Sequence, residues 1–253
     1  MLQNMDFSVF CKDIVTGDMI AGCLGSGRDI SYLNWIFKAW GWTVSVSLSA
    51  LLLALVLGSL IGIIRTLPNS PWLVRFGNAW VEWFRNIPLL VQIFLWYHVF
   101  PALVPAAKGI PGFLLVVMAL GLFTSARIAE QVRAGISALP RGQRYAGMAL
   151  GFTTPQYYRY VLLPMAYRMI IPPLTSESMN IFKNSAVAFA VSIPELTQFA
   201  MQAGEETGHV IEMYFAVTVL YVISAMCINR IMAYIEKRSR LPGFVAAGTG
   251  GGH

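Results

Sequence analysis

Four polar residues interrupt a long apolar run in the C-terminal half of the chain: Glu177, Asn180, Lys183 and Asn184. On a helix, side chains three or four positions apart share a face, so this spacing predicts a polar stripe. A charge in an apolar environment is costly unless it meets water, a partner or a substrate. The Lys183 ammonium group could attract a carboxylate, which makes the stripe a candidate substrate pathway. The alternative is a structural network that holds a neighbouring helix.

Two arginines allow a similar pair of interpretations. Arg85 and Arg127 could each help an anionic substrate to pass, and both are candidate pathway residues. Each also lies near the end of an apolar run, where basic residues ordinarily flank the cytoplasmic side of a membrane span. Glu130 lies three residues from both Arg127 and Arg133 and can pair with either of them.

Other kinds of chemistry lack the residues they need. The chain has no G-x-x-x-x-G-K-[ST] loop for nucleotide phosphates, so any ATP must be hydrolysed by another subunit. The histidines lack the spacing of metal ligands: His98, His209 and His253. No serine lies in a G-x-S-x-G elbow, and Glu177 and Glu195 are too isolated to form a catalytic pair. We therefore expect no enzymatic activity, no metal and no cofactor bound by this chain.

A polar, basic segment at residues 140–164 separates the apolar runs and reads PRGQRYAGMALGFTTPQYYRYVLLP. Good helix formers from Gln143 to Leu150 end at Gly151, a common C-terminal stop. A second helix is predicted to start with Thr154 as its N-cap, ahead of a proline at the first helical position.

The first of these short helices carries little side-chain bulk. Ala146, Gly147 and Ala149 are small, and Gly147 lies four residues before Gly151, so we expect a partner to approach this backbone closely. The segment is therefore predicted to be a docking surface outside the lipid. The alternative is a basic amphipathic helix that lies on anionic headgroups.

The spacing of this segment resembles a known family. Tyr145-Ala146-Gly147, three residues, Gly151, nine residues and Val161-Leu162-Leu163-Pro164 is similar to the EAA loop of ABC importer permeases. That loop has Glu where this chain has Tyr145 and Ala where it has Gly147. The resemblance implies a coupling helix that docks on a cytoplasmic ATPase dimer, through Gln143, Tyr145, Ala146, Gly147, Gly151, Leu163 and Pro164. The missing Glu suits a heterodimer with a second permease.

Three further segments, at residues 85–92, 126–136 and 180–185, are similar to the polar amino acid permeases of that family, and LFTSARIAEQVRAGISALPRGQ resembles its glutamate/aspartate importers. The resemblance implies a type I ABC importer permease fold and import of polar amino acids. It also implies an ATPase that uses ATP and Mg, a second homologous permease, and an external or periplasmic amino acid-binding protein. The cytoplasmic, or inner, membrane is the expected location.

The composition independently indicates an all-α integral membrane protein. The chain is 57% hydrophobic and 12% charged, with a mean hydropathy of +0.62, which is too apolar for a soluble domain. Gly58 and Gly62 indicate close helix packing in the first span, and an interfacial helix rich in aromatic residues is expected at 67–84. Five membrane helices are predicted, at 39–64, 86–107, 110–126, 169–203 and 213–229. The third is expected to continue beyond 126, and the fourth is expected to be broken.

Basic residues give the predicted orientation. Of the 18 Lys and Arg residues, four lie on the same predicted side of the membrane as the N-terminus and one lies within the membrane. The other thirteen lie on the side of residues 140–164 and the C-terminus. By the positive-inside rule, the N-terminus is outside and the C-terminus cytoplasmic. These membrane-flanking residues account for the net charge of +6 without a nucleic-acid partner.

The chain is predicted to have three regions: an external N-terminal segment at 1–38, a transmembrane permease domain at 39–243 and a flexible tail at 244–253. Cys11 and Cys23 lie in the external segment. Unpaired thiols are the favoured interpretation, although an oxidising compartment would allow the two to pair.

Two other functions stay open. A self-sufficient secondary carrier or channel would use Glu177 and Lys183 as ion-coupling groups, and would transport without an ATPase. A membrane scaffold would leave amino acid uptake unchanged when the chain is deleted.

Overall fold

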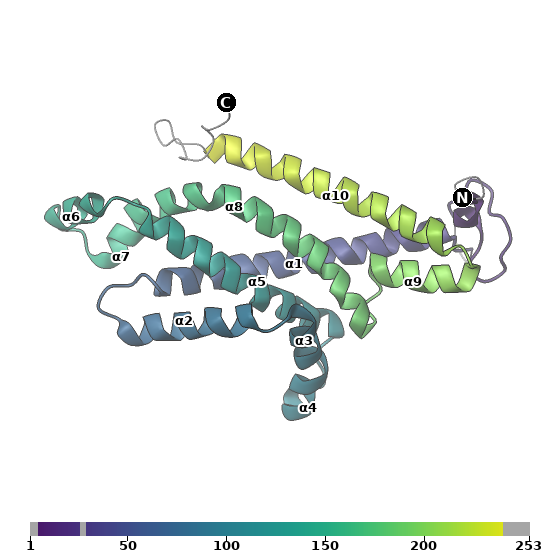
Figure 1. Ribbon diagram of the computed structural model, residues 1–253, viewed down its shortest axis with the longest axis horizontal. Coiled ribbons are helices and arrows are strands. Elements are labelled where there is room, and N and C mark those ends of the chain that lie inside the picture. Colours follow the sequence, from purple (N-terminus) through teal and green to yellow (C-terminus); the bar gives the residue numbers. More distant parts are fainter. Residues whose placement is uncertain (1–4, 26–28, 240–253) are drawn as a thin grey trace.

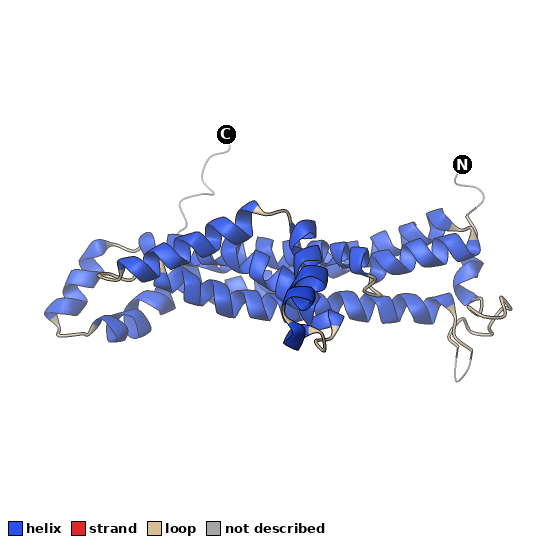
Figure 2. Cartoon of the chain, turned by 90° about the horizontal axis from the view of Figure 1, so that it is seen from below, coloured by secondary structure: helices blue, strands red, loops and turns tan. Residues whose placement is uncertain are grey.

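The computed structural model describes residues 5–25 and 29–239, which form an elongated helical bundle (Figure 1). Helices and loops make up these residues, without a β-strand (Figure 2). Their α-helices are α1 (Tyr32–Ile64), α2 (Pro71–Asn86), α3 (Leu89–Phe94), α4 (Phe100–Leu103), α5 (Gly112–Ser137), α6 (Arg141–Ala149), α7 (Thr154–Tyr157), α8 (Leu163–Asn184), α9 (Leu196–Thr207) and α10 (Val210–Ser239). The tail predicted at 244–253 lies outside the described residues.

Helices α1 and α5 pack together because small residues let their backbones approach. A Cβ added at Gly58 would lie 2.7 Å from the Ile128 Cβ, and one at Gly62 would lie 2.6 Å from the Val132 Cβ. Such distances are too short for real carbon atoms, so these two positions require glycine. The predicted packing role of the pair is therefore confirmed.

Helix α1 starts earlier than predicted. It begins at Tyr32 rather than Ala39, because the Ser31 hydroxyl accepts a hydrogen bond from the Asn34 N–H at 3.2 Å and caps the helix. The helix that was expected to be interfacial forms as α2. It packs against α5, where the Trp80 indole N–H donates to the Ser125 hydroxyl at 3.1 Å.

The helix predicted at 86–107 forms as a helical segment at Leu89–Leu103, but a separate membrane span there is not confirmed. The chain turns by 104° between α2 and the segment that runs from α3 to α4, and α4 projects sideways from the bundle (Figure 1). Pro88 stops the helix from continuing. The Gln92 side-chain amide then holds the bend, because it donates to the carbonyl oxygens of Phe84 at 2.7 Å and Ile87 at 3.0 Å.

Three helices of the described residues are long and apolar enough to cross a membrane, namely α1, α5 and α10. The bent pair that starts with α2 would make a fourth span, so five spans are not confirmed. The break predicted within 169–203 is confirmed. Helix α8 ends at Asn184, a 3-10 segment follows at Ser185–Val191, and Ser192 turns the chain at a positive φ of 57° before α9.

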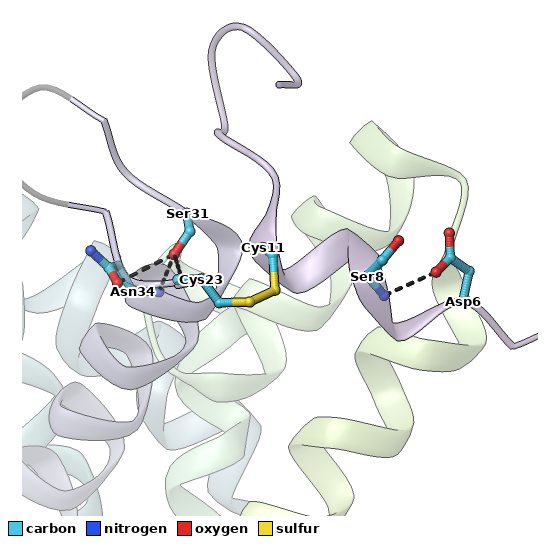
Figure 3. The surroundings of a disulfide bond; sticks show 6 residues. All are labelled: Asp6, Ser8, Cys11, Cys23, Ser31 and Asn34. Atoms are coloured by element: carbon cyan, nitrogen blue, oxygen red, sulfur yellow. Dashed lines mark hydrogen bonds between the residues drawn. A yellow bond between two sulfur atoms is a disulfide. The ribbon is translucent and has the colours of Figure 1, made fainter. Parts of the chain in front are cut away.

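The N-terminal segment folds over the N-terminal ends of α1 and α10, at the opposite end of the bundle from α6 (Figure 1). Cys11 and Cys23 form a disulfide, so the favoured interpretation of unpaired thiols is wrong (Figure 3). Asp13 organises the loop between them. Its carboxylate accepts hydrogen bonds from the N–H groups of Val15 at 2.8 Å, Thr16 at 2.9 Å and Ile30 at 2.9 Å. The backbone hydrogen bonds from Thr16 and Val15 lower the pKa of Asp13 below its ordinary value of 3.8.

Candidate functional site

The candidate docking segment forms α6, a turn and α7 at one end of the bundle (Figure 1). Helix α6 ends as predicted at Gly151, which has a φ of +80°. The Gly151 N–H donates to the Met148 carbonyl and the Phe152 N–H donates to the Gly147 carbonyl, each at 3.0 Å. This pair of bonds is a Schellman cap, which fixes the direction of the chain after α6.

Gly147 faces its own chain rather than a partner. A Cβ added there would lie 3.0 Å from the Tyr157 ring and 3.7 Å from the Phe152 ring. The prediction that Gly147 and Gly151 form one open face is therefore wrong, because Gly151 lies beyond the helix and Gly147 packs on α7. The N-cap of α7 is Thr153, not Thr154, and the Thr153 N–H donates to the Gln156 side chain at 2.9 Å.

Three large side chains of α6 and its C-cap are exposed. Tyr145 is 64% exposed, Met148 48% and Leu150, at the C-cap, 77%. Ala146 is also exposed, whereas Gln143 is half-buried. The remaining predicted coupling residues, Leu163 and Pro164, lie apart from α6, in the first turn of α8.

A second candidate site lies between α5 and α8. The Arg127 guanidinium donates from Nε and Nη2 to the two carboxylate oxygens of Glu177, at 2.8 and 3.0 Å. The Gln131 amide also donates to Glu177 at 3.2 Å. Glu177 has 6% of its side chain exposed and Arg127 has 42%, so the carboxylate is the buried partner. Gln131 was missed in the sequence because an uncharged amide in a charged helix end carries no distinctive signal.

Within the described residues, Glu130 forms an ion pair with neither arginine of its own helix. It accepts from Arg85 of α2 at 2.6 Å, and both side chains are substantially exposed. The reason is tertiary, because α2 packs beside α5 and brings Arg85 within reach of Glu130. Together the two ion pairs join α5 to α2 and α8.

The predicted polar stripe on α8 divides into two environments. Glu177 is buried against α5, Asn180 and Asn184 are half-buried, and Lys183 is exposed. A helix turns by about 100° per residue, so Lys183 lies about 120° around α8 from Glu177. Among the described residues, no carboxylate lies within 4.0 Å of the Lys183 ammonium. Lys183 is thus a cation without an ion partner in the described part of the chain.

Glu195 is a buried carboxylate that sequence reasoning treated only as an isolated acid. It caps α9 by accepting from the N–H groups of Thr197 and Gln198, each at 2.8 Å, and from the Tyr221 hydroxyl at 3.1 Å. The next residue, Leu196, donates its N–H to the Thr43 hydroxyl at 3.1 Å. These contacts tie the start of α9 to α1 and α10, and they give Glu195 a structural role. Within the described ranges, no three His, Cys, Asp or Glu side chains converge to hold a metal ion.

Residues 54–241, which include the C-terminal part of α1 and all of α2 to α10, match the family described as binding-protein-dependent transport system inner membrane component. The chain belongs to this family. Glutamate/aspartate import permease protein GltJ of Escherichia coli O6:H1 is 44% identical over 223 residues, covering 84% of this chain and 90% of GltJ. Glutamate/aspartate import permease protein GltK of the same organism is 25% identical, covering 78% of this chain and 90% of GltK.

A solved structure agrees with the family assignment. The crystal structure of an amino acid ABC transporter with histidines has a chain that superposes with a TM-score of 0.72 at 28% identity, covering 82% of this chain and 95% of the other. The matched family region contains α6, Arg127, Glu177 and Lys183. The disulfide-bonded N-terminal segment lies before the matched residues.

Proposed function

We propose that this family member is the transmembrane permease subunit of an ATP-driven ABC importer for polar amino acids, with glutamate and aspartate as substrates. The observation that carries the proposal is the 44% identity to GltJ over most of both chains. The helical docking segment at one end of the bundle supports the same function. The chain catalyses no reaction itself, because it lacks a phosphate-binding loop and depends on a partner that binds ATP and Mg.

The assembly would contain three kinds of partner. A cytoplasmic ABC ATPase dimer would bind α6, a second homologous permease would complete the membrane part, and an external amino acid-binding protein would deliver the substrate. That GltJ and GltK occur in one organism supports a heterodimer of permeases. The whole assembly would lie in the cytoplasmic membrane, with the N-terminal segment in the periplasm.

Five crossings, by α1, the bent pair of α2 with the α3–α4 segment, α5, α8 and α10, fit the arrangement best. Helices α1, α2, α5, α8 and α10 run along the long axis of the molecule, whereas α3 and α4 run across it (Figure 1). The N-terminal disulfide supports an external N-terminus, because disulfides persist in oxidising compartments. With the opposite end cytoplasmic, α6 faces the compartment that contains ATP.

Alternating access is the mechanism we infer. ATP-driven closure of the ATPases moves α6, and the Schellman cap and the packing on α7 transmit that motion to α8. The exposed cations Lys183 and Arg127 would attract the carboxylate of an acidic amino acid in the membrane part. The ion pair of Arg127 with Glu177 would hold the guanidinium in place as the helices move.

The decisive experiment reconstitutes the whole transporter in liposomes with external binding protein and labelled glutamate. We expect ATP-dependent uptake that unlabelled aspartate competes away, and no uptake when the ATPase is omitted. Uptake that continues without the ATPase would instead identify a secondary carrier. A chain whose deletion leaves uptake unchanged would be a scaffold.

A further inference from the structure

An apolar groove lies at the end of the bundle where the N-terminal segment meets α1 and α10. Its volume is about 440 Å³, and its walls come from these three elements. The side chains that line it are aliphatic, aromatic or part of the disulfide between Cys11 and Cys23, so the described part of the chain gives its wall no charge. The charged groups of an amino acid would stay unpaired there. The groove therefore suits an apolar ligand and not an amino acid.

Three phenyl rings, one from each wall, line the groove and remain open to the outside. Phe7 of the N-terminal segment is 45% exposed, Phe37 of α1 is 50% exposed and Phe215 of α10 is 53% exposed. The rings of Phe7 and Phe215 meet edge to face, with their centres 6.0 Å apart. A contiguous aromatic surface of this kind rarely faces water, so we expect it to have an apolar neighbour.

The groove is continuous with an uncovered apolar face of α10. Helices α1 and α10 are both long and apolar enough to cross a membrane. In its most apolar stretch α10 is 22% buried within the described chain, compared with 67% for α5. Its exposed face continues from the groove through Val222, Ile223 and Met226. A lipid that lies against α10 therefore reaches the groove without crossing a polar surface.

Aromatic residues indicate where the groove lies relative to the membrane. Trp35 and Tyr214 are at the level of the lining residues of their helices. About one turn further along both helices, the Trp40 indole N–H donates to the Ser224 hydroxyl at 2.9 Å. Tryptophan and tyrosine are enriched where lipid headgroups meet the apolar interior of a membrane. The groove therefore lies beside the first methylenes of the lipid acyl chains.

The size of the groove favours a hydrocarbon chain over a protein helix. A helix about 10 Å across that rises 5.4 Å per turn fills about 420 Å³ in one turn. A groove of about 440 Å³ would hold little more than that single turn. An unbranched hydrocarbon chain is much thinner, so a longer stretch of it fits. A helix of another subunit could cover the groove but could not lie within it.

We propose that this groove binds one acyl chain of a phospholipid, in the leaflet at the disulfide end of the bundle. The chain lies between Phe37 and Phe215, and Phe7 covers it from the N-terminal segment. The inference needs only that α1 and α10 lie in a membrane, so it goes beyond the proposed transport function. The bound lipid differs from lipids that merely coat the helices, because the N-terminal segment supplies part of its site.

The test uses the intact transporter in vesicles of phosphatidylethanolamine and phosphatidylglycerol, with a trace of phosphatidylethanolamine that carries a diazirine on one acyl chain. After illumination, peptide mass spectrometry locates the attached lipid. We expect label on the stretches around Phe37 and Phe215. Val219→Trp should abolish the label near Phe37, because the indole fills the groove. Val222→Trp is the matched control, since Val222 is 53% exposed on α10 but does not line the groove.

Phe7→Ala separates a built site from lipids that only coat the membrane helices. Phe7 lies before α1, so its truncation should lower the label near Phe37 only if the N-terminal segment covers the bound chain. Equal labelling of the unmodified chain, Val219→Trp and Phe7→Ala would overturn the inference. Labelling that appears only when the second permease is left out would also overturn it, and would assign the groove to the contact between permeases. Equal thermal stability of the variants in detergent excludes misfolding as the cause.

Discussion

Arg127 makes two hydrogen bonds to Glu177 and keeps further N–H groups for another acceptor, because a guanidinium has five donors. Its side chain is half-exposed, whereas the carboxylate that orients it is buried. Glu177 therefore holds the Arg127 guanidinium in a fixed place and leaves some of its N–H groups available for another acceptor. Lys183 differs, because nothing in the described part of the chain neutralises it.

Glu177→Ala should destabilise the permease by about 1–3 kcal/mol, because it leaves the Arg127 and Gln131 donors without their acceptor. Glu177→Gln should cost less, since one carbonyl oxygen remains. Thermal unfolding of the purified chain in detergent measures both effects. Equal melting temperatures for the alanine variant and the unmodified chain would show that the ion pair contributes nothing to stability.

Lys183→Ala should reduce uptake of glutamate and aspartate while the transporter still assembles. The reason is that a membrane-level cation without an ion partner attracts an anionic substrate. Lys108→Ala provides a control, because Lys108 is also exposed but lies in the turn before α5. Uptake kinetics in liposomes test the expectation, and unaltered kinetics for Lys183→Ala would assign Lys183 a structural role.

At the level of elements, α6 is positioned by its C-terminal cap. Gly151 has a φ of +80° and open space around it, so its requirement for glycine comes from the backbone and not from crowding. Gly142, inside α6, has equally open space and no unusual φ. The two glycines therefore form a matched pair in which only the backbone conformation differs.

Gly151→Ala should uncouple ATP hydrolysis from uptake, because a left-handed conformation costs an L-residue about 1–2 kcal/mol and the strain would shift α6. Gly142→Ala should be neutral, since alanine favours a helix. The ratio of ATP hydrolysed to glutamate imported measures the coupling. An unchanged ratio in Gly151→Ala would mean that the direction of the chain after α6 is unimportant.

The N-terminal segment should lose order in acid. Because the pKa of Asp13 is lowered in the folded chain, its carboxylate stabilises the segment above pH 3.8, its ordinary pKa, and this contribution is lost as the pH falls through the lowered value. Hydrogen-exchange protection of the Thr16 and Ile30 amides should therefore decrease below pH 3.8. Asp13→Asn should lower that protection even at neutral pH. If protection changes neither with pH nor with this substitution, the Asp13 carboxylate does not order the segment.

For the whole molecule, the proposed orientation places α6 and the disulfide on opposite sides of the membrane. With Cys227 replaced by Ser, a membrane-impermeant maleimide should label Glu205→Cys in intact cells but should label Thr154→Cys only after permeabilisation. Both positions are exposed, and they lie at the ends of α9 and α7, at opposite ends of the bundle (Figure 1). Labelling of Thr154→Cys in intact cells would reverse the topology.

Local patterns in the sequence determined several features of the fold. Gly151 ended α6, the glycine pair in α1 marked its contact with α5, and the polar interruptions after 169 marked the break that follows α8. Each depends on the conformational or steric properties of a few neighbouring residues. These properties act before any tertiary contact forms, so they can be read along the chain.

Only the tertiary structure decided which side chains meet. Glu130 had an arginine three residues away on either side, yet it pairs with Arg85, and Arg127 pairs with Glu177, fifty residues further along the chain. Cys11 pairs with Cys23 because the Asp13 loop brings them together. Helix periodicity defines which residues share a face, but not which neighbour covers that face. The packing of α2, α5 and α8 supplies that information.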